Sequence, residues 1–275
     1  MMKIYINILF TLTTLQAIGF DAVNIFSSPD DLALSGTGVA SRNSIYSSPA
    51  ISKTNYSKLS FSANKWVQNF SGNSFLFFND RFRLTFNSIG LEDIEVYDET
   101  PSEFPLDIIS SHYLSFGISK GFNIKQFIFG IGANFQYSQL FTKDVSVVTY
   151  DIGLKKIFSE NLRFGLLAKN LSNSNFNVPS SYTMGCSFYS PRTNTELLID
   201  YNYSSTYNSG THIGFIQKIK LLTLKSGYSD YNSRTTLSAG LGLDLNKKYS
   251  FLYSILYLKD TNLGLSHYFG LELSI

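Results

Sequence analysis

The sequence of 275 residues predicts an all-β fold: a transmembrane antiparallel β-barrel of about 14 strands, preceded by an N-terminal plug segment. Three observations predict it. Apolar residues alternate with small or polar residues through most of the chain beyond residue 55. Aromatic residues reach 16%, whereas charged residues are only 15%, which is low for a soluble domain. Every second connection between the alternating segments is a tight turn, and most of the others are longer.

The composition argues against several other classes of protein. A formal net charge of +2 gives little attraction for nucleic acid, so no such partner is expected. The single Cys excludes a disulfide framework and a cysteine-based zinc site. The three histidines, His112, His212 and His267, match no metal-binding spacing. We therefore expect no cofactor, no metal centre and no catalytic residue, and hence a protein that is not an enzyme.

Residues 1–19 are predicted to be a signal peptide. Lys3 supplies the positive start, an apolar run follows from Ile4, and small residues precede a cleavage site before Phe20. The alternative is an N-terminal membrane anchor, but the run is short for a spanning helix, which needs about 20 residues.

Residues 20–55 do not alternate, and we expect them to form the plug. Ser28 to Asp31 read as a helix start, with a capping serine, a proline in the first turn and two acids near the positive end of the helix dipole. Gly36 and Gly38 are expected to end that helix, and a second turn is expected at Ser48, Pro49 and Ala50. The alternative is a disordered periplasmic tail, which the apolar residues of the segment argue against.

Residues 56–275 are expected to form the barrel. Segments of 8 to 13 residues, such as Phe127 to Tyr137, place apolar side chains on one face and Gly, Ser or Asn on the other. A tilted strand needs about 9 to 11 residues to cross an outer membrane, with its apolar face against lipid. Fourteen such segments begin near residues 56, 72, 82, 111, 126, 144, 161, 180, 195, 210, 222, 234, 248 and 263.

The connections give the barrel an orientation, because bacterial barrels have short periplasmic turns and longer outer loops. The expected tight turns lie at 79–81, 123–125, 159–161, 191–194, 220–221 and 246–248. The expected outer loops lie at 92–110, 170–180, 204–210 and 229–234. The connection near 142–144 is the exception, because it is short for an outer loop.

Alternation places eight charged side chains on the lumen face: Arg83, Asp151, Arg163, Lys169, Asp200, Lys225, Asp244 and Glu272. Charges within a membrane span usually pair or line a functional path. The hypothesis is that some of them pair with Asp30, Asp31 and Arg42 and so hold the plug. The alternative is a simple water-filled lumen.

One predicted outer loop is strongly acidic. It holds seven acids and no base between residues 92 and 107: Glu92, Asp93, Glu95, Asp98, Glu99, Glu103 and Asp107. We favour a solvated loop. The alternatives are a Ca²⁺ site, a basic partner, or cross-bridging of lipopolysaccharide through divalent ions.

Several motifs resemble one family in their order and spacing. They are Ala33 to Ala40, Ser48 to Ile51, Lys65-Trp66, Asp98 to Pro101, Tyr150 to Leu154, Leu166 to Leu171, Val178-Pro179 and Leu263 to Phe269. Together they resemble the PorV/PorQ family, which is similar to FadL-type transporters whose plug carries an Asn-Pro-Ala motif. Ser48 stands in place of that Asn.

The resemblance implies a 14-stranded outer-membrane barrel with a plug, in a Gram-negative-type bacterium. It implies first a role in type IX secretion, docking exported proteins by their C-terminal signal domains, with secretion-system subunits and membrane lipid as expected partners. The alternative is FadL-like transport of hydrophobic small molecules. A third is a structural barrel with no through-path.

Overall fold

The computed structural model describes residues 20, 22, 25–42, 45–66, 70–96, 104–140, 143–172, 178–205, 208–231, 234–246, 248–259 and 265–275. The predicted signal peptide, residues 1–19, lies outside the described residues. A short helix, α2 (Pro29–Ala33), precedes the strands. No helix in the described ranges is long and apolar enough to cross a membrane.

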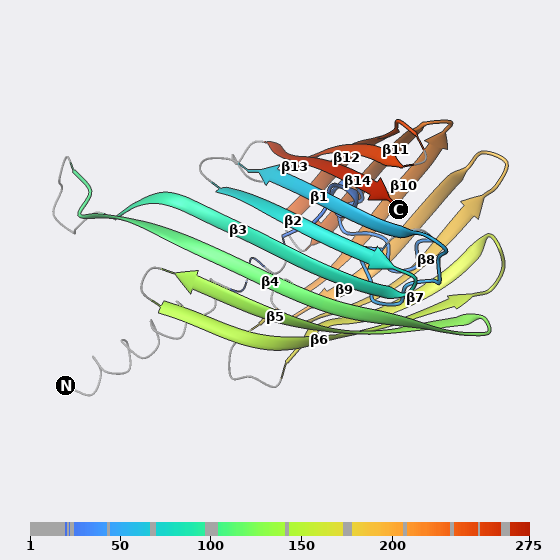
Figure 1. The fold of residues 1–275 in the computed structure, drawn as a ribbon, viewed down its shortest axis with the longest axis horizontal. Coiled ribbons are helices and arrows are strands. Elements are labelled where there is room, and N and C mark those ends of the chain that lie inside the picture. Colours follow the sequence, from blue (N-terminus) through green and yellow to red (C-terminus); the bar gives the residue numbers. More distant parts are fainter. Residues whose placement is uncertain are drawn as a thin grey trace.

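The strands, from Ser57 to Ser274, form a closed antiparallel barrel in which each strand pairs with its neighbour in sequence and β1 pairs with β14 (Figure 1). This confirms the predicted fold class and strand count. The strands are β1 (Ser57–Lys65), β2 (Phe70–Asn79), β3 (Phe82–Val96), β4 (Asp107–Ile124), β5 (Phe127–Leu140), β6 (Lys143–Ile157), β7 (Leu162–Leu171), β8 (Ser181–Ser190), β9 (Thr195–Ser204), β10 (Asn208–Ile219), β11 (Leu222–Tyr231), β12 (Arg234–Asp244), β13 (Tyr249–Leu258) and β14 (Leu265–Ser274).

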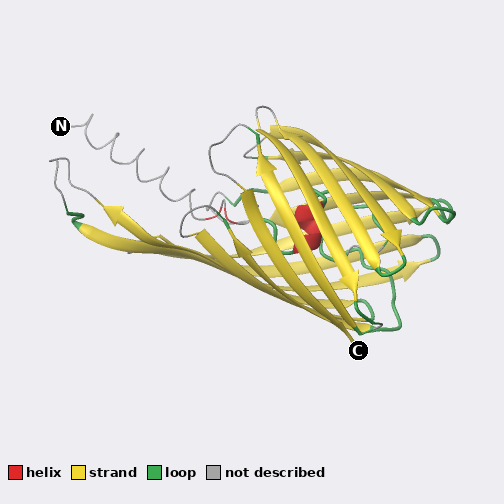
Figure 2. Cartoon of the chain, turned by 90° about the horizontal axis from the view of Figure 1, so that it is seen from above, coloured by secondary structure: helices red, strands yellow, loops and turns green. Residues whose placement is uncertain are grey.

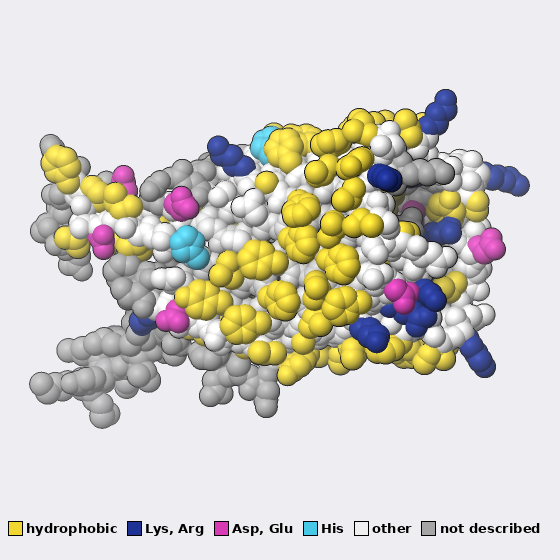
Figure 3. Space-filling model, in the orientation of Figure 1, with side chains coloured by type: hydrophobic (Ala, Val, Ile, Leu, Met, Phe, Trp, Pro, Cys, Tyr) yellow, Lys and Arg dark blue, Asp and Glu magenta, His cyan; other side chains and the backbone are white. Residues whose placement is uncertain are grey.

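The outer wall is apolar, as the alternation predicts. On β5, Phe129, Ile131 and Phe135 point outward with 42%, 56% and 48% of their surface exposed, while Ile128 and Gln136 of the same strand are buried in the lumen. Figure 3 shows the resulting belt of hydrophobic side chains across the visible wall. Such a surface is stable only against lipid, because exposure of so large an apolar patch to water is unfavourable.

The tight turns lie at the end of the barrel that carries the C-terminus. Asp80, Lys125, Asn194 and Lys220 adopt left-handed backbone conformations there, with φ between 51° and 53°. Such residues allow two antiparallel strands to reconnect within a few residues. We assign this end to the periplasm, because short turns mark the periplasmic side of bacterial barrels.

The expected outer loop at 92–110 is wrong in its extent. β3 continues to Val96 and β4 begins at Asp107, so the two strands form a ribbon that projects beyond the rest of the barrel (Figure 2). A register shift between Leu91 and Ile94 marks where the ribbon begins. Three of the seven acids, at positions 98, 99 and 103, lie outside the described residues. The neighbouring strands β5 and β6 are also long, at 14 and 15 residues, which is why their connection is short.

Candidate functional site

The lumen holds the N-terminal segment. Helix α2 is capped by Ser28, whose Oγ accepts a hydrogen bond from the amide of Asp31 at 3.1 Å. The helix ends after Ala33, and the chain turns through Ser35 and Gly36, whose φ angles are 49° and 77°. Leu32 is fully buried among Leu256 of β13 and Tyr268 of β14. The helix therefore lies inside the barrel (Figure 2).

Inward-facing glycines of the strands allow the plug backbone to pack directly against the barrel wall. A Cβ atom on Gly130 would lie 2.1 Å from the carbonyl carbon and oxygen of Pro49, and one on Gly153 would lie 2.6 Å from Ser48 Oγ. The predicted plug motif at 48–50 is thus pressed onto β5 and β6. Ser48 Oγ also accepts a hydrogen bond from the amide of Ala50 at 3.1 Å, which closes the local turn.

Arg83 of β3 makes the densest set of contacts to the plug. Its guanidinium Nη1 donates hydrogen bonds to the carbonyl oxygens of Ile45, Tyr46 and Ser48, at 2.6, 2.9 and 3.4 Å. Its Nε donates to Ser119 Oγ of β4 at 3.0 Å. Because Arg83 is buried, these contacts satisfy backbone groups that water cannot reach.

Asp200 of β9 binds the plug in the opposite sense. Its Oδ2 accepts hydrogen bonds from the amides of Gly38 and Val39, at 2.7 and 3.0 Å. Lys155 of β6 donates to the carbonyl oxygen of Ser41 at 3.2 Å. Carboxylates of the wall thus accept hydrogen bonds from plug amides, and cationic side chains of the wall donate hydrogen bonds to plug carbonyls.

The predicted ion pairs with plug charges are only partly present. Lys225 of β11 pairs with Asp30. Arg42 instead stacks its guanidinium over the ring of Tyr189 at 4.0 Å and donates its backbone amide to Glu196 Oε1 at 2.9 Å. Ion pairs are few because the plug backbone offers many more polar groups to the wall than the charged side chains of the plug do.

The other predicted lumen charges have different partners. Glu272 accepts from Lys58 at 2.6 Å and from the plug hydroxyl of Tyr46 at 2.7 Å. Asp151 accepts from the side chain of Asn134 and the amide of Asn170, at 2.9 and 2.8 Å.

Asp151 and three further predicted lumen charges make no hydrogen bond or ion pair to the plug in the described part of the chain. Asp244 pairs with Lys218 at 2.9 Å. Arg163 has a buried Nε without a hydrogen-bond partner, and Lys169 lines a cavity.

The sequence prediction missed several plug contacts, three of which involve a charged residue or a histidine. Lys155 and Glu196 face inward by the same alternation that selected the other charges, so that signal was available for both. The third contact joins Nδ1 of His212 to the carbonyl oxygen of Ser35 at 2.7 Å. Alternation alone could not show that this histidine meets the plug. No group of three or more potential metal ligands occurs among the residues that the structure describes.

Two cavities flank the plug. A small one, of about 80 Å³, is lined largely by amide and hydroxyl side chains, including Asn64, Asn134 and Gln136, together with Phe26 and Tyr46 of the plug. A larger one, of about 990 Å³, lies toward the periplasmic turns and is lined by charged residues, among them Asp31 and Lys220. The plug therefore occupies the lumen between two polar spaces.

The outer mouth of the lumen is different, because it is apolar. Ile89, Tyr113, Val147 and Val178 are buried there around Phe20, which is only 1% exposed. Apolar side chains on a lumen face are unusual in a water-filled barrel, whose interior is polar. Here they enclose the ring of Phe20.

Lower pH is expected to tighten plug docking. Burial raises the pKa of the Asp31 carboxyl from 3.8 to about 6, so the docked plug binds a proton between these values that a released plug would lose. Burial also acts to raise the pKa of Asp30, but the charges of Lys225 and Lys58, together with the hydrogen bond from Lys225, outweigh it and hold that pKa below 3.8, outside this window. Hydrogen exchange of residues 30–41 should therefore slow as pH falls from 7 to 5. Asp31→Asn should weaken this dependence, and an unchanged slope in that variant would contradict the assignment.

The closed barrel, its lipid-facing belt and its occupied lumen define the class of protein: this is an outer-membrane β-barrel with an N-terminal plug. Neither protein-family models nor curated proteins gave a match to the sequence. Among solved structures, the chain is similar to a deletion mutant of TodX, the monoaromatic hydrocarbon channel of Pseudomonas putida, at a TM-score of 0.62 and 12% identity, covering 90% of this chain and 97% of that one.

Two further structures are similar. The toluene transporter TbuX of Ralstonia pickettii has a TM-score of 0.58 and 11% identity, covering 90% of this chain and 97% of that one. The outer membrane protein Omp33 of Acinetobacter baumannii has a TM-score of 0.51 and 5% identity, covering 80% and 97%. The chain therefore shares its fold with these outer-membrane barrels, which are described as channels, transporters and an outer membrane protein.

Proposed function

We propose that this protein passes hydrophobic small molecules across the outer membrane. The observation that carries the proposal is the apolar outer mouth around Phe20, placed directly above a plugged lumen. TodX and TbuX, which have similar folds, are described as hydrocarbon and toluene transporters, which supports the same class of solute here. A small aromatic hydrocarbon matches the size and chemistry of the ring that the mouth already buries.

The test is uptake of toluene and of a polar solute of similar size by cells that express the protein in place of their own transporter. Val147→Asp puts a charge into the mouth and should lower toluene uptake about tenfold, since even partial loss of apolar contact is worth about 1.4 kcal/mol. Ser146→Asp is the matched control, because this neighbouring side chain is exposed on the outer face. Equal toluene uptake by the two variants, or equal uptake of both solutes by the unmodified protein, would refute hydrophobic transport.

Docking of exported proteins, the role implied by the PorV/PorQ resemblance, is the second candidate. One feature favours it: Phe104, Leu106 and Ile108 on the projecting ribbon are 76%, 72% and 59% exposed. Exposed apolar patches beyond the membrane belt are typical of protein-binding surfaces. Purification from the native envelope, with mass spectrometry of bound proteins and lipids, separates the two. Secreted proteins with a shared C-terminal domain would favour docking, and a bound hydrocarbon without them would favour transport.

A further inference from the structure

Lys120 is out of place on the lipid-facing wall. It lies on β4 between Ile118 and Phe122, which are 43% and 39% exposed on the same outward face. It pairs across the sheet with Phe82 and Ile131. A lysine on this face is costly unless its ammonium reaches a polar partner, and no ion pair to it exists in the described part of the chain.

The side chain of Lys120 points toward the periplasm. Its Nζ stands 5.7 Å from the centre of the Phe122 ring, and Phe122 is closer to the periplasmic turn. The amide of Gly121 donates to the carbonyl oxygen of Arg81 at 2.8 Å, which puts Lys120 at the level of the neighbouring turn. The ammonium is therefore at the height of the periplasmic headgroups, where lysines on membrane proteins commonly end.

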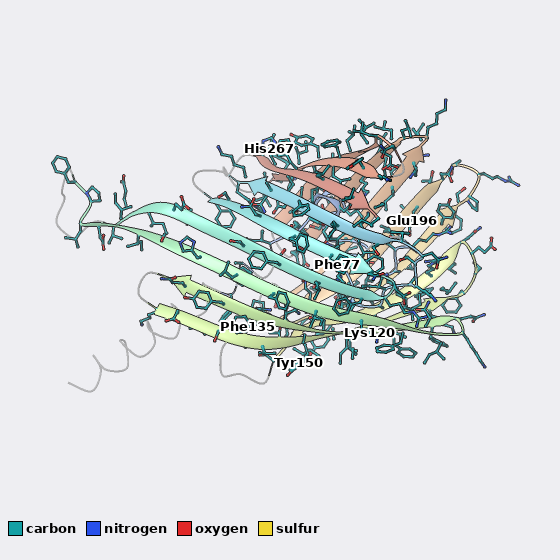
Figure 4. The ribbon with its side chains drawn as sticks, viewed as in Figure 1. Phe77, Lys120, Phe135, Tyr150, Glu196 and His267 are labelled. Atoms are coloured by element: carbon teal, nitrogen blue, oxygen red, sulfur yellow. The ribbon has the colours of Figure 1, made fainter. Side chains whose placement is uncertain are left out.

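An apolar groove starts at the same lysine. It has a volume of about 500 Å³ and is lined by Lys120, Ile118, Ile131, Ala133, Tyr150 and Ile152. Ala133 pairs with Ile118 on one side and Tyr150 on the other, so the groove results from one small side chain among large ones. Figure 4 shows Lys120 and Tyr150 on the same part of the wall. The groove extends from the register row of Lys120, Ile131 and Ile152 to the row of Ala133, which is further from the periplasmic turns.

The surrounding surface is also basic. The periplasmic turns and adjoining strand ends carry Arg81, Lys125, Lys156, Arg192, Lys220 and Lys248 against Asp80 and Glu160. Lys156 of β6, like Lys120, stands over aromatic rings, at 4.3 Å from the ring of Phe158 and 5.4 Å from that of Phe127. In Figure 3, basic side chains gather at the end opposite the projecting ribbon, whose charged side chains are mostly acidic. This end of the barrel therefore attracts anions.

We propose that the groove over β4, β5 and β6 is a binding site for an anionic phospholipid of the periplasmic leaflet, with an acyl chain over Ala133 and the headgroup phosphate on the Lys120 ammonium. A cation at one end of an apolar groove fits an amphiphile with an anionic head, and the direction of the groove from the periplasmic surface fits that leaflet. The site is on the outer wall, so it is independent of the transport proposed for the lumen.

The test is native mass spectrometry of the full folded barrel incubated with phosphatidylglycerol or phosphatidylcholine. The unmodified protein should retain phosphatidylglycerol about fivefold more than phosphatidylcholine, and Lys120→Gln should remove that preference. Lys120→Arg should keep it. Lys125→Gln, which removes a turn lysine, is the matched control and should also keep it.

A second variant tests the groove without changing charge. Ala133→Phe fills the groove from the lipid-facing side and should lower retention of phosphatidylglycerol about fivefold, while heat-modifiable migration on gels shows that the barrel is still folded. The proposal is overturned if Lys125→Gln acts like Lys120→Gln, because the attraction would then be diffuse. It is overturned equally if Ala133→Phe has no effect, or if lipid A is retained in preference to phosphatidylglycerol, since lipid A belongs to the other leaflet.

Discussion

Gly130→Ala should release the plug from the wall. The added Cβ would lie 2.1 Å from the carbonyl of Pro49 and 2.3 Å from the amide nitrogen of Ala50. Both are backbone atoms, so no side-chain rotation can relieve the clash, and the segment at 48–51 must move. Overpacking of a rigid site costs about 3 kcal/mol at the upper end of the usual range. We expect hydrogen exchange of residues 45–52 to accelerate about 100-fold and small solutes to cross the barrel more readily.

The matched control is Gly132→Ala, two residues further along the same face of β5. A Cβ there would meet only barrel atoms, at 3.2 Å from Ser119 Cβ and 3.4 Å from the carbonyl oxygen of Ile118. It adds the same methyl group to the same strand without touching the plug. Equal protection of residues 45–52 in the two variants would contradict the conclusion that the plug packs directly against Gly130.

Arg83→Met should loosen the same segment by a different route. Methionine keeps much of the length of the side chain but leaves the carbonyl oxygens of Ile45 and Tyr46 without their donor. An unsatisfied buried group costs about 1 to 3 kcal/mol, so loss of these contacts should weaken docking by about 2 to 3 kcal/mol, or about 30- to 150-fold in exchange rate. The measurement is exchange at residues 45–48, with barrel stability followed separately by heat-modifiable migration.

Arg163→Met is the control for the removal of a lumen arginine. Arg163 also faces inward, but it makes no hydrogen bond to the described part of the plug, and its Nε has no partner. Its loss should leave exchange at residues 45–48 unchanged. A similar acceleration in both variants would show that net lumen charge, rather than the specific contacts of Arg83, holds the plug.

The sequence predicts the barrel well because successive side chains of a strand point to opposite faces, so the two faces appear in the sequence as an alternation with a period of two. The alternation predicts that Phe129 and Ile131 face lipid and that Arg83 and Asp200 face the lumen, even when the residues that they contact are unknown. The prediction of a loop at 92–110 fails because Glu92 and Glu95 interrupt the apolar pattern of the strand. The backbone hydrogen bonds of a two-stranded ribbon do not require an apolar pattern, so the strands continue past these residues.

The candidate site is less predictable for a related reason. Alternation says that Arg83 faces the lumen, but not that it meets Ile45, because the path of the plug has no periodicity to read. Phe20 and its apolar surroundings come from five separate parts of the chain, and only the closed barrel brings them together. Sequence patterns therefore find the wall, whereas the contacts across the lumen depend on the assembled structure.

The contacts of the plug also set an order of events during assembly. Asp30 meets Lys225, Pro29 receives a hydrogen bond from Ser254, and Tyr46 meets Glu272, in each case about 200 residues later in the chain. Strand pairing joins neighbours, so the barrel wall can grow by local steps, but these three plug contacts wait for strands near the C-terminus. The N-terminal segment is synthesised before the strands, but it completes its native contacts only after the last strands have formed, and until then its apolar residues need protection in the periplasm.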